Sequence, residues 1–237
     1  MNADFREGVL DARRALGAVW SGTVATASLL LLAAVGVLEG QAIGSGTSAR
    51  HVQLRLLAGV AFGLVLPLVA FAASARVGGR LRDLMTMSWA RYGGNRRVFA
   101  LGRVALVALG GGALTASIGV LALWLGSATA APTLELPPSW VNLLTVTWVA
   151  LLGAASYTTA FSAAHLYAGN AGRVLFLIAD WLLGSSTGAL ALPWPRAHLR
   201  TLLGGTAPLS LETHDAALCL LAITIVATFL YTRRLPA

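Results

Sequence analysis

The chain has 237 residues, of which 57% are hydrophobic and 11% charged, and its net charge at neutral pH is +8. With a mean hydropathy of +0.76, this balance excludes an ordinary soluble domain and predicts an all-α, polytopic membrane protein. All 17 basic residues are arginine, so the chain has neither the lysine of a nucleotide-binding P-loop nor a lysine for Schiff-base chemistry.

Residues 1–16 predict a short helix that precedes the first membrane span. Phe5, Val9, Ala12 and Leu16 recur on one helical stripe, while the charged residues occupy the other faces. Such an amphipathic segment lies in the membrane interface and leads into the first span. The alternative interpretation is a frayed, charged tail.

Six apolar runs are each long enough to cross the bilayer as a helix. A hydrocarbon core about 30 Å thick requires roughly 20 apolar residues, because a helix rises about 1.5 Å per residue. The links between these runs are too short to be separate domains, so the whole chain is expected to form one transmembrane domain, residues 1–237. The six runs are residues 17–38, 56–75, 104–125, 140–163, 174–193 and 216–232.

The arginines predict which side of the membrane the termini face. Arginines close to the ends of spans are retained in the cytoplasm. With six spans both termini share one side, and that side holds thirteen arginines against four on the other. We therefore expect both termini to be cytoplasmic, in the cytoplasmic (inner) membrane of a prokaryote.

The link after the second span, residues 80–97, concentrates arginines in one place. Helical spacing of its apolar side chains predicts a short amphipathic helix on the cytoplasmic surface. The letters GGN at 93–95 break this helix, and RRVFALGR at 96–103 starts the helix of the third span. Taken alone, the charge is explained by the positive-inside rule and by contact with anionic headgroups. One face of the amphipathic helix comprises Leu81, Leu84, Met85, Ser88, Trp89 and Tyr92.

This order of features resembles the permeases of type-2 ATP-binding-cassette exporters, which also have six spans, an interfacial N-terminal helix and cytoplasmic termini. The likeness rests on the amphipathic helix after the second span, the turn, and the RRVFALGR motif. It implies that residues 80–97 are a coupling loop that docks into a groove of a separate ATPase. It also implies that ATP and Mg²⁺ bind on that partner, with no cofactor on this chain. The implied docking residues are Leu84, Met85, Trp89, Arg91, Tyr92, Arg96 and Arg97.

The same resemblance implies a partly re-entrant segment before the last span. Residues 194–213 include PWPRAHLRTLLGG, which precedes the run at 216–232 and corresponds to the external segment of these permeases. In that family two such subunits form the translocation path, so a homodimer or a pair with a similar permease is expected.

Asp180 is the one acidic residue inside the fifth apolar run. An intramembrane carboxylate is a candidate functional residue because an unpaired charge there is costly. One interpretation is a structural ion pair with Arg173 or Arg103, and the other is substrate contact or proton relay. Tyr157 and Thr159 of the fourth run either line a polar path or bond to carbonyl groups of their own helix.

Two further patterns near the C-terminus have competing interpretations. GSSTG at 184–188 presents Ser186 as the nucleophile of an intramembrane hydrolase, or provides small residues for close helix packing. The histidines His165 and His214 lie at the wrong depth for a catalytic base, which favours packing. A metal site at His198, Glu212, His214 and Asp215 matches no known spacing, so capping of the last helix by Thr213 or Asp215 is favoured and no metal is expected.

These features predict a permease subunit of an exporter, which forms the path as a dimer and is not itself an enzyme. Two alternatives from other classes stay open: a serine hydrolase that uses Ser186, and a non-transporting membrane scaffold subunit. The expected partners are an ATP-binding-cassette ATPase, a second permease subunit and the lipid bilayer, with no nucleic acid.

Overall fold

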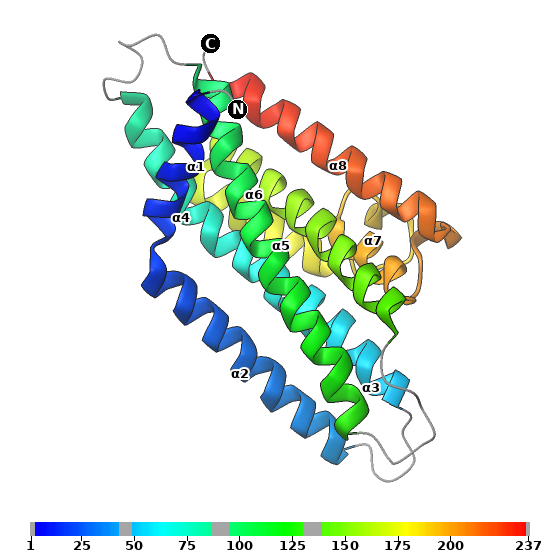
Figure 1. The fold of residues 1–237 in the computed structure, drawn as a ribbon. Coiled ribbons are helices and arrows are strands. Elements are labelled where there is room, and N and C mark those ends of the chain that lie inside the picture. The colour runs from blue at the N-terminus through cyan, green and yellow to red at the C-terminus, as the bar shows by residue number, and fades with distance from the viewer. Residues whose placement is uncertain (1–2, 43–48, 87–94, 130–138, 236–237) are drawn as a thin grey trace.

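The computed structural model describes residues 3–42, 49–86, 95–129 and 139–235, which fold as helices joined by turns (Figure 1). Five of the described helices are long and apolar enough to cross a membrane. The predicted all-α architecture is therefore confirmed, and the protein has the build of a multi-pass membrane protein.

The helices follow the order of the apolar runs. They are α1 (Ala3–Leu16), α2 (Ala18–Ala42), α3 (Ala49–Arg55), the π-helical η2 (Leu56–Val65), α4 (Leu66–Thr86), α5 (Arg96–Thr129), α6 (Trp140–Leu183), the short η4 (Ala189–Ala191), α7 (Pro195–Leu202), the short η5 (Pro208–Ser210) and α8 (Thr213–Arg234).

The centre of the bundle is one long helix made of α3, η2 and α4. In its most apolar window 67% of the residues are buried, compared with 17% for α2. A helix that is hydrophobic on all sides is buried by its neighbours, and here α5 and α6 pack against it around Phe62 and Leu66. The predicted second span is therefore found, within a helix that extends beyond it at both ends.

The start of α5 confirms the predicted helix restart after the GGN turn. The Asn95 side chain accepts hydrogen bonds from the backbone N–H groups of Arg97 and Val98, at 3.1 and 3.2 Å. An asparagine in this position satisfies N–H groups that have no partner within the helix, and so fixes where the helix begins.

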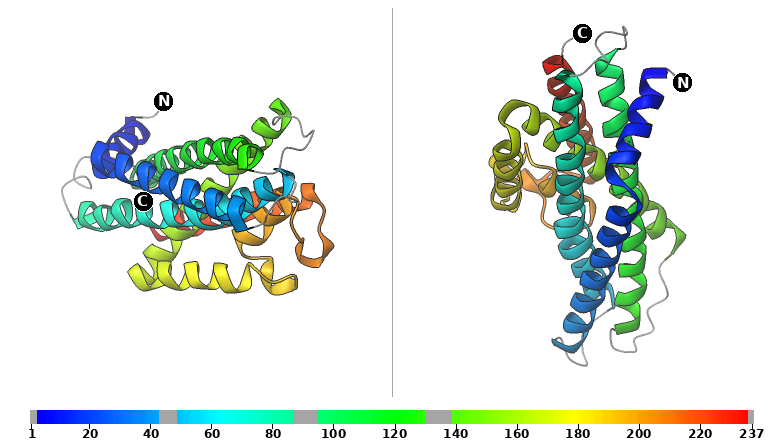
Figure 2. Two further views of the ribbon diagram at one scale, coloured as in Figure 1. Left: turned by 90° about the horizontal axis from the view of Figure 1, so that it is seen from below. Right: turned by 90° about the vertical axis from the view of Figure 1, so that its left-hand side faces the viewer.

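The fourth and fifth predicted spans both lie in α6, a 44-residue element that doubles back on itself. The backbone is non-helical at Ala168 and Gly169, and Gly169 has φ +61° and ψ −145°, a conformation that glycine adopts readily. The Tyr157 hydroxyl lies 2.7 Å from the Asp180 carboxylate. In a straight helix 23 residues would separate these groups by about 35 Å, so the sections before and after the break run antiparallel. Both sections are visible as separate helices in Figure 2.

The fifth predicted span is wrong at its end. Helix α6 stops at Leu183, and the segment that follows forms turns up to the short η4 rather than continuing to Pro193. The GSSTG letters therefore lie in a turn and not in a packed helix. Gly184 nevertheless permits close packing, because a Cβ there would meet the Cβ atoms of Trp194 and Arg196 at 3.2 and 3.0 Å.

The predicted external segment folds back into the bundle. Helix α7 buries Ala197, His198 and Leu199 almost completely, and it packs against α8, α6 and η2. Proline at its first position suits a helix start, because the missing N–H would have no partner there.

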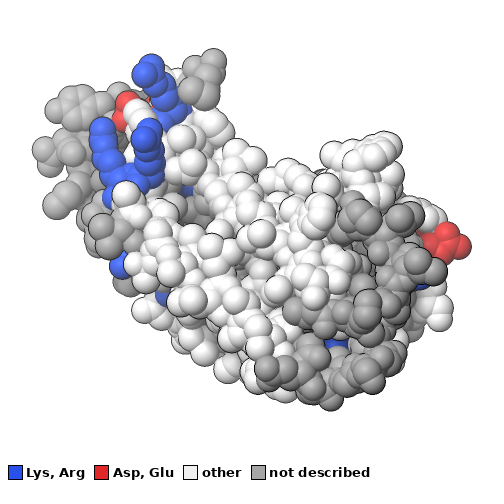
Figure 3. Space-filling view, turned by 60° about the horizontal axis from the view of Figure 1, so that its bottom comes forward, with Lys and Arg blue, Asp and Glu red and all other residues white. Residues whose placement is uncertain are grey.

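Charged ends of the helices gather at one end of the molecule, here called the basic end. It contains the start of α1, the end of α4, the start of α5 and the end of α8 (Figure 1). On the face seen in Figure 3, most of the described surface is uncharged, and basic side chains cluster at one end. The basic end includes Arg6, Arg13, Arg14, Arg96, Arg97, Arg103, Arg233 and Arg234.

Helix α1 is held closely against the first turns of α5. A Cβ on Gly8 would overlap the Phe99 carbonyl, and one on Gly102 would overlap the Phe5 carbonyl, so both glycines permit backbone contact. The carboxylate of Asp11 forms an ion pair with Arg103 at 3.1 Å. The predicted N-terminal helix is confirmed, and it is a packed element rather than a frayed tail.

Candidate functional site

Asp180 is the centre of a buried polar cluster. Its side chain has no exposed surface, and its two carboxylate oxygens accept different hydrogen bonds. One oxygen accepts from the Tyr157 hydroxyl at 2.7 Å, and the other accepts from the backbone N–H of Arg196 at 3.1 Å. Asp180 therefore ties together both sections of α6 and the start of α7.

Arg196 extends this cluster to the central helix. One guanidinium nitrogen donates to the Gly63 carbonyl at 2.7 Å, and the guanidinium lies 5.5 Å from the centre of the Trp181 ring. Gly63 belongs to the π-helical η2, and π-helical turns occur frequently at functional sites. Gly63 is 13 residues into the span Arg50–Val77, so Arg196 reaches roughly the middle of that helix. Sequence reasoning placed Arg196 in an external loop and gave no signal for this contact.

A recess of about 250 Å³ opens between η2 and α7, beside the Asp180 cluster. Its walls include Phe62, Gly63, Leu199 and the two arginines Arg196 and Arg200. Arg200 donates to the carbonyl groups of Ser185, Ser186 and Thr206 at 2.8, 3.0 and 3.0 Å, and so fastens the turns around α7. The recess thus combines apolar walls with two fixed guanidinium groups.

The predicted ion pair of Asp180 with Arg173 or Arg103 is wrong. Arg173 donates to the Asn170 side chain at 2.6 Å and to the Phe71 carbonyl at 3.2 Å, and it lies 5.0 Å from the Phe71 ring. Arg103 pairs with Asp11 of α1. The sequence spacing of these residues could not predict the partners of Asp180, because the reversal of α6 decides which side chains face it.

The polar side chains of the first section of α6 have different roles. Tyr157 joins Asp180, as described. The Thr159 hydroxyl donates to the Ala155 carbonyl at 2.8 Å, the back-bonded alternative. Ser156 lies 2.8 Å from the Thr224 hydroxyl and thereby links α6 to α8.

The described polar side chains near the C-terminus bond mainly to nearby backbone carbonyl groups. The Ser186 hydroxyl donates to the Leu183 carbonyl at 2.8 Å, and the His198 ring bonds the Leu192 carbonyl at 2.8 Å, so the two side chains are not paired with each other. Asp215 caps α8 together with Glu212, as predicted. Within the described part of the chain, no group of three or more His, Cys, Asp or Glu side chains could hold a metal ion.

The predicted docking residues fall only partly within the described structure. Leu84 and Met85 lie in α4 near its end, and Arg96 and Arg97 begin α5. The Arg97 side chain donates to the Leu235 carbonyl at 3.4 Å, which connects α5 to the C-terminus. Trp89, Arg91 and Tyr92 lie outside the described residues, so the predicted coupling helix stays a prediction.

The fold and the site define an all-helical, multi-pass membrane protein with a buried polar cluster that anchors a folded-back segment. Comparison of the chain with protein-family models, with curated proteins and with solved structures finds no match.

Proposed function

We propose that the chain is the permease subunit of an ATP-binding-cassette exporter of the type-2 kind, driven by a separate ATPase. The observation that carries the proposal is the basic end. There α1, the start of α5 and the C-terminus are joined by Asp11–Arg103, Asp4–Asn95 and Arg97–Leu235 contacts, next to the end of α4. A connected surface of this kind can transmit a movement of the ATPase to several membrane helices at once.

The proposal includes six crossings with both termini in the cytoplasm of a prokaryote. The second section of α6 has 14 helical residues after the break, about 21 Å in length, which is shorter than a bilayer core. We infer that this section and the folded-back segment around α7 complete the fifth crossing together. The gathering of arginines at the basic end supports a cytoplasmic location for that end.

The polar cluster has a mechanical role in this proposal. Asp180 and Arg196 connect α7 to both sections of α6 and to the central helix, so a shift of the central helix also moves the folded-back segment. Two subunits, either identical or similar, would enclose the path. Because the chain has no lysine for a P-loop, the proposal places ATP and Mg²⁺ on the partner ATPase.

Replacing Trp89 and Tyr92 together by aspartate is expected to abolish association with the ATPase. Tryptophan and tyrosine side chains often carry a large share of the binding free energy at an interface. Loss of both should therefore weaken binding by about 100-fold or more. The measurement is co-purification of the full-length chain with a soluble P-loop ATPase encoded beside it.

The control is Trp140→Asp, which changes a tryptophan that is 70% exposed at the start of α6, away from the basic end. This variant should retain the ATPase. Undiminished binding by the Trp89/Tyr92 variant would reject residues 80–97 as the docking surface. Full function of the purified chain without any ATPase would reject the proposed function and favour the scaffold or enzyme classes.

A further inference from the structure

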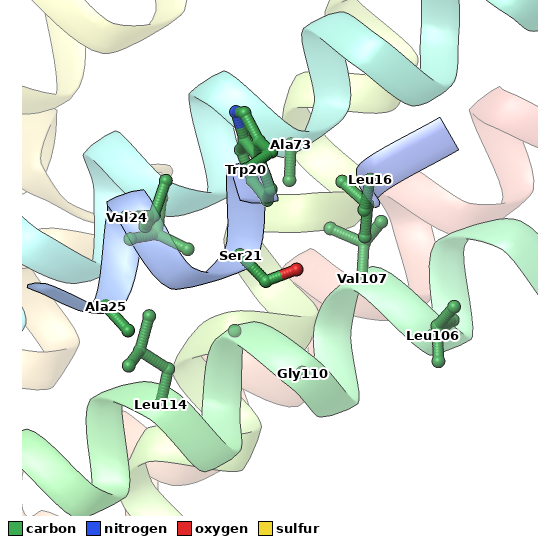
Figure 4. A pocket seen from close by; sticks show the side chains of 12 residues that line it. Leu16, Trp20, Ser21, Val24, Ala25, Ala73, Leu106, Val107, Gly110 and Leu114 are labelled. Carbon is green, nitrogen blue, oxygen red and sulfur yellow. The ribbon is translucent and has the colours of Figure 1, made fainter. Parts of the chain in front are cut away.

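An apolar cavity of about 230 Å³ lies between α2 and the pair α4–α5, near the basic end (Figure 4). Trp20 and Val24 of α2 form one wall. Ala73 of α4, with Val107 and Leu114 of α5, form the other. On α5 the lining extends from Leu106 to Leu114, a length of about 12 Å.

The path of the chain creates this cavity. Helix α1 touches α5 at Gly8, and α2 touches α5 again at Gly36, where a Cβ would overlap the Leu125 side chain. Between these two contacts the chain bends at Gly17, whose φ of +63° favours glycine. The bend carries the first turns of α2 away from α5, and Gly110 faces the gap with no atom within 4 Å of where its Cβ would be. The cavity is therefore part of the fold rather than a local packing defect.

Positive charge borders the cavity on its basic-end side. The guanidinium of the exposed Arg76 lies 5.9 Å from the centre of the Trp20 ring, which lines the cavity. The exposed Arg13 lies about one helical turn before Leu16, another lining residue, and so on the same face of α1. An apolar interior with a cationic rim is complementary to a molecule that has an acyl chain and an anionic head.

We propose that this cavity binds one anionic glycerophospholipid of the surrounding bilayer. An acyl chain occupies the space between Trp20 and Gly110, and the phosphate lies against Arg76 and Arg13. Clusters of basic residues at the membrane surface favour anionic lipids, and burial of methylene groups favours the chain. The bound lipid would fill the gap between α2 and α5. This site does not depend on whether an ATPase drives the protein.

The test is lipid retention by the full-length protein in detergent, measured by native mass spectrometry. Dioleoyl phosphatidylglycerol is compared with dioleoyl phosphatidylcholine, which has the same chains and no net charge. We expect phosphatidylglycerol to bind more tightly. Gly110→Leu should weaken its binding by about tenfold or more, because leucine fills the space needed by about two methylene groups. Leucine also favours the helix more than glycine does, so the variant should fold.

Two matched controls separate this site from general effects. Gly22→Leu makes the same change on an exposed face of α2 outside the cavity, and Arg6→Gln removes a basic-end charge away from it. Both should retain the lipid, whereas Arg76→Gln should reduce the preference for phosphatidylglycerol over phosphatidylcholine. Equal binding of the two lipids would overturn the anionic assignment. Undiminished binding by Gly110→Leu would overturn the cavity as the site, and neither result bears on ATPase docking.

Discussion

Replacing Asp180 by alanine is expected to lower the free energy of unfolding by about 3 kcal/mol, because two buried donors lose their acceptor at about 1–3 kcal/mol each. The donors are the Tyr157 hydroxyl and the Arg196 backbone N–H. Denaturant titration of the purified protein in detergent measures the loss. The segment around α7 should unfold before the rest of the protein. Tryptic cleavage after Arg196 and Arg200 should therefore become faster in the variant.

The order of effects among related variants tests this interpretation. Asp180→Asn retains an acceptor and should cost less, as should Tyr157→Phe, which removes one hydroxyl at about 1 kcal/mol. In the Asp180→Ala background, Tyr157→Phe should cost almost nothing or restore some stability, because the unsatisfied hydroxyl is then absent. Additive losses in the double variant, or equally faster cleavage after the exposed Arg6, would contradict a local cluster centred on Asp180.

Replacing Asp11 by alanine is expected to lower the free energy of unfolding by about 3–5 kcal/mol, the usual cost of removing one partner of a buried ion pair. The reason is an asymmetry in exposure: the Arg103 side chain is 0% exposed, whereas that of Asp11 is 21% exposed. Without Asp11, the buried guanidinium loses this carboxylate and keeps its other contacts, such as that with the Phe99 ring at 5.9 Å. The measurement is again unfolding in detergent, together with the rate of tryptic cleavage within α1.

Replacing Arg103 instead of Asp11 should lower the free energy of unfolding by less, so the two single variants serve as controls for each other. Arg103→Met leaves the carboxylate of Asp11, which has access to water, and the methionine still fills apolar space. The double variant Asp11→Ala with Arg103→Met should therefore be more stable than Asp11→Ala alone. If Arg103→Met proves the more damaging single change, then contacts of Arg103 other than the ion pair hold α1 in place. In the proposed exporter, loosening α1 should also reduce coupling to the ATPase.

The sequence by itself determined the class of protein and the location of its charge. Apolar runs and the arginine bias depend on the composition of short segments, and the energy of placing such segments in a membrane is close to a sum over their residues. For the same reason the N-terminal helix, the restart of the helix after GGN and the capping of α8 by Asp215 were predictable. Each depends on residues within a few positions of one another.

Only the tertiary structure decided what surrounds the polar residues. Asp180 has Tyr157 and Arg196 as partners because α6 reverses at Gly169, and Arg196 contacts Gly63 across 133 positions of the chain. The end of the fifth run was mispredicted for the same reason, since hydropathy does not distinguish a spanning helix from an apolar segment that folds back into the bundle. Which distant groups meet follows from the packing of all helices together, and no local pattern of residues encodes that.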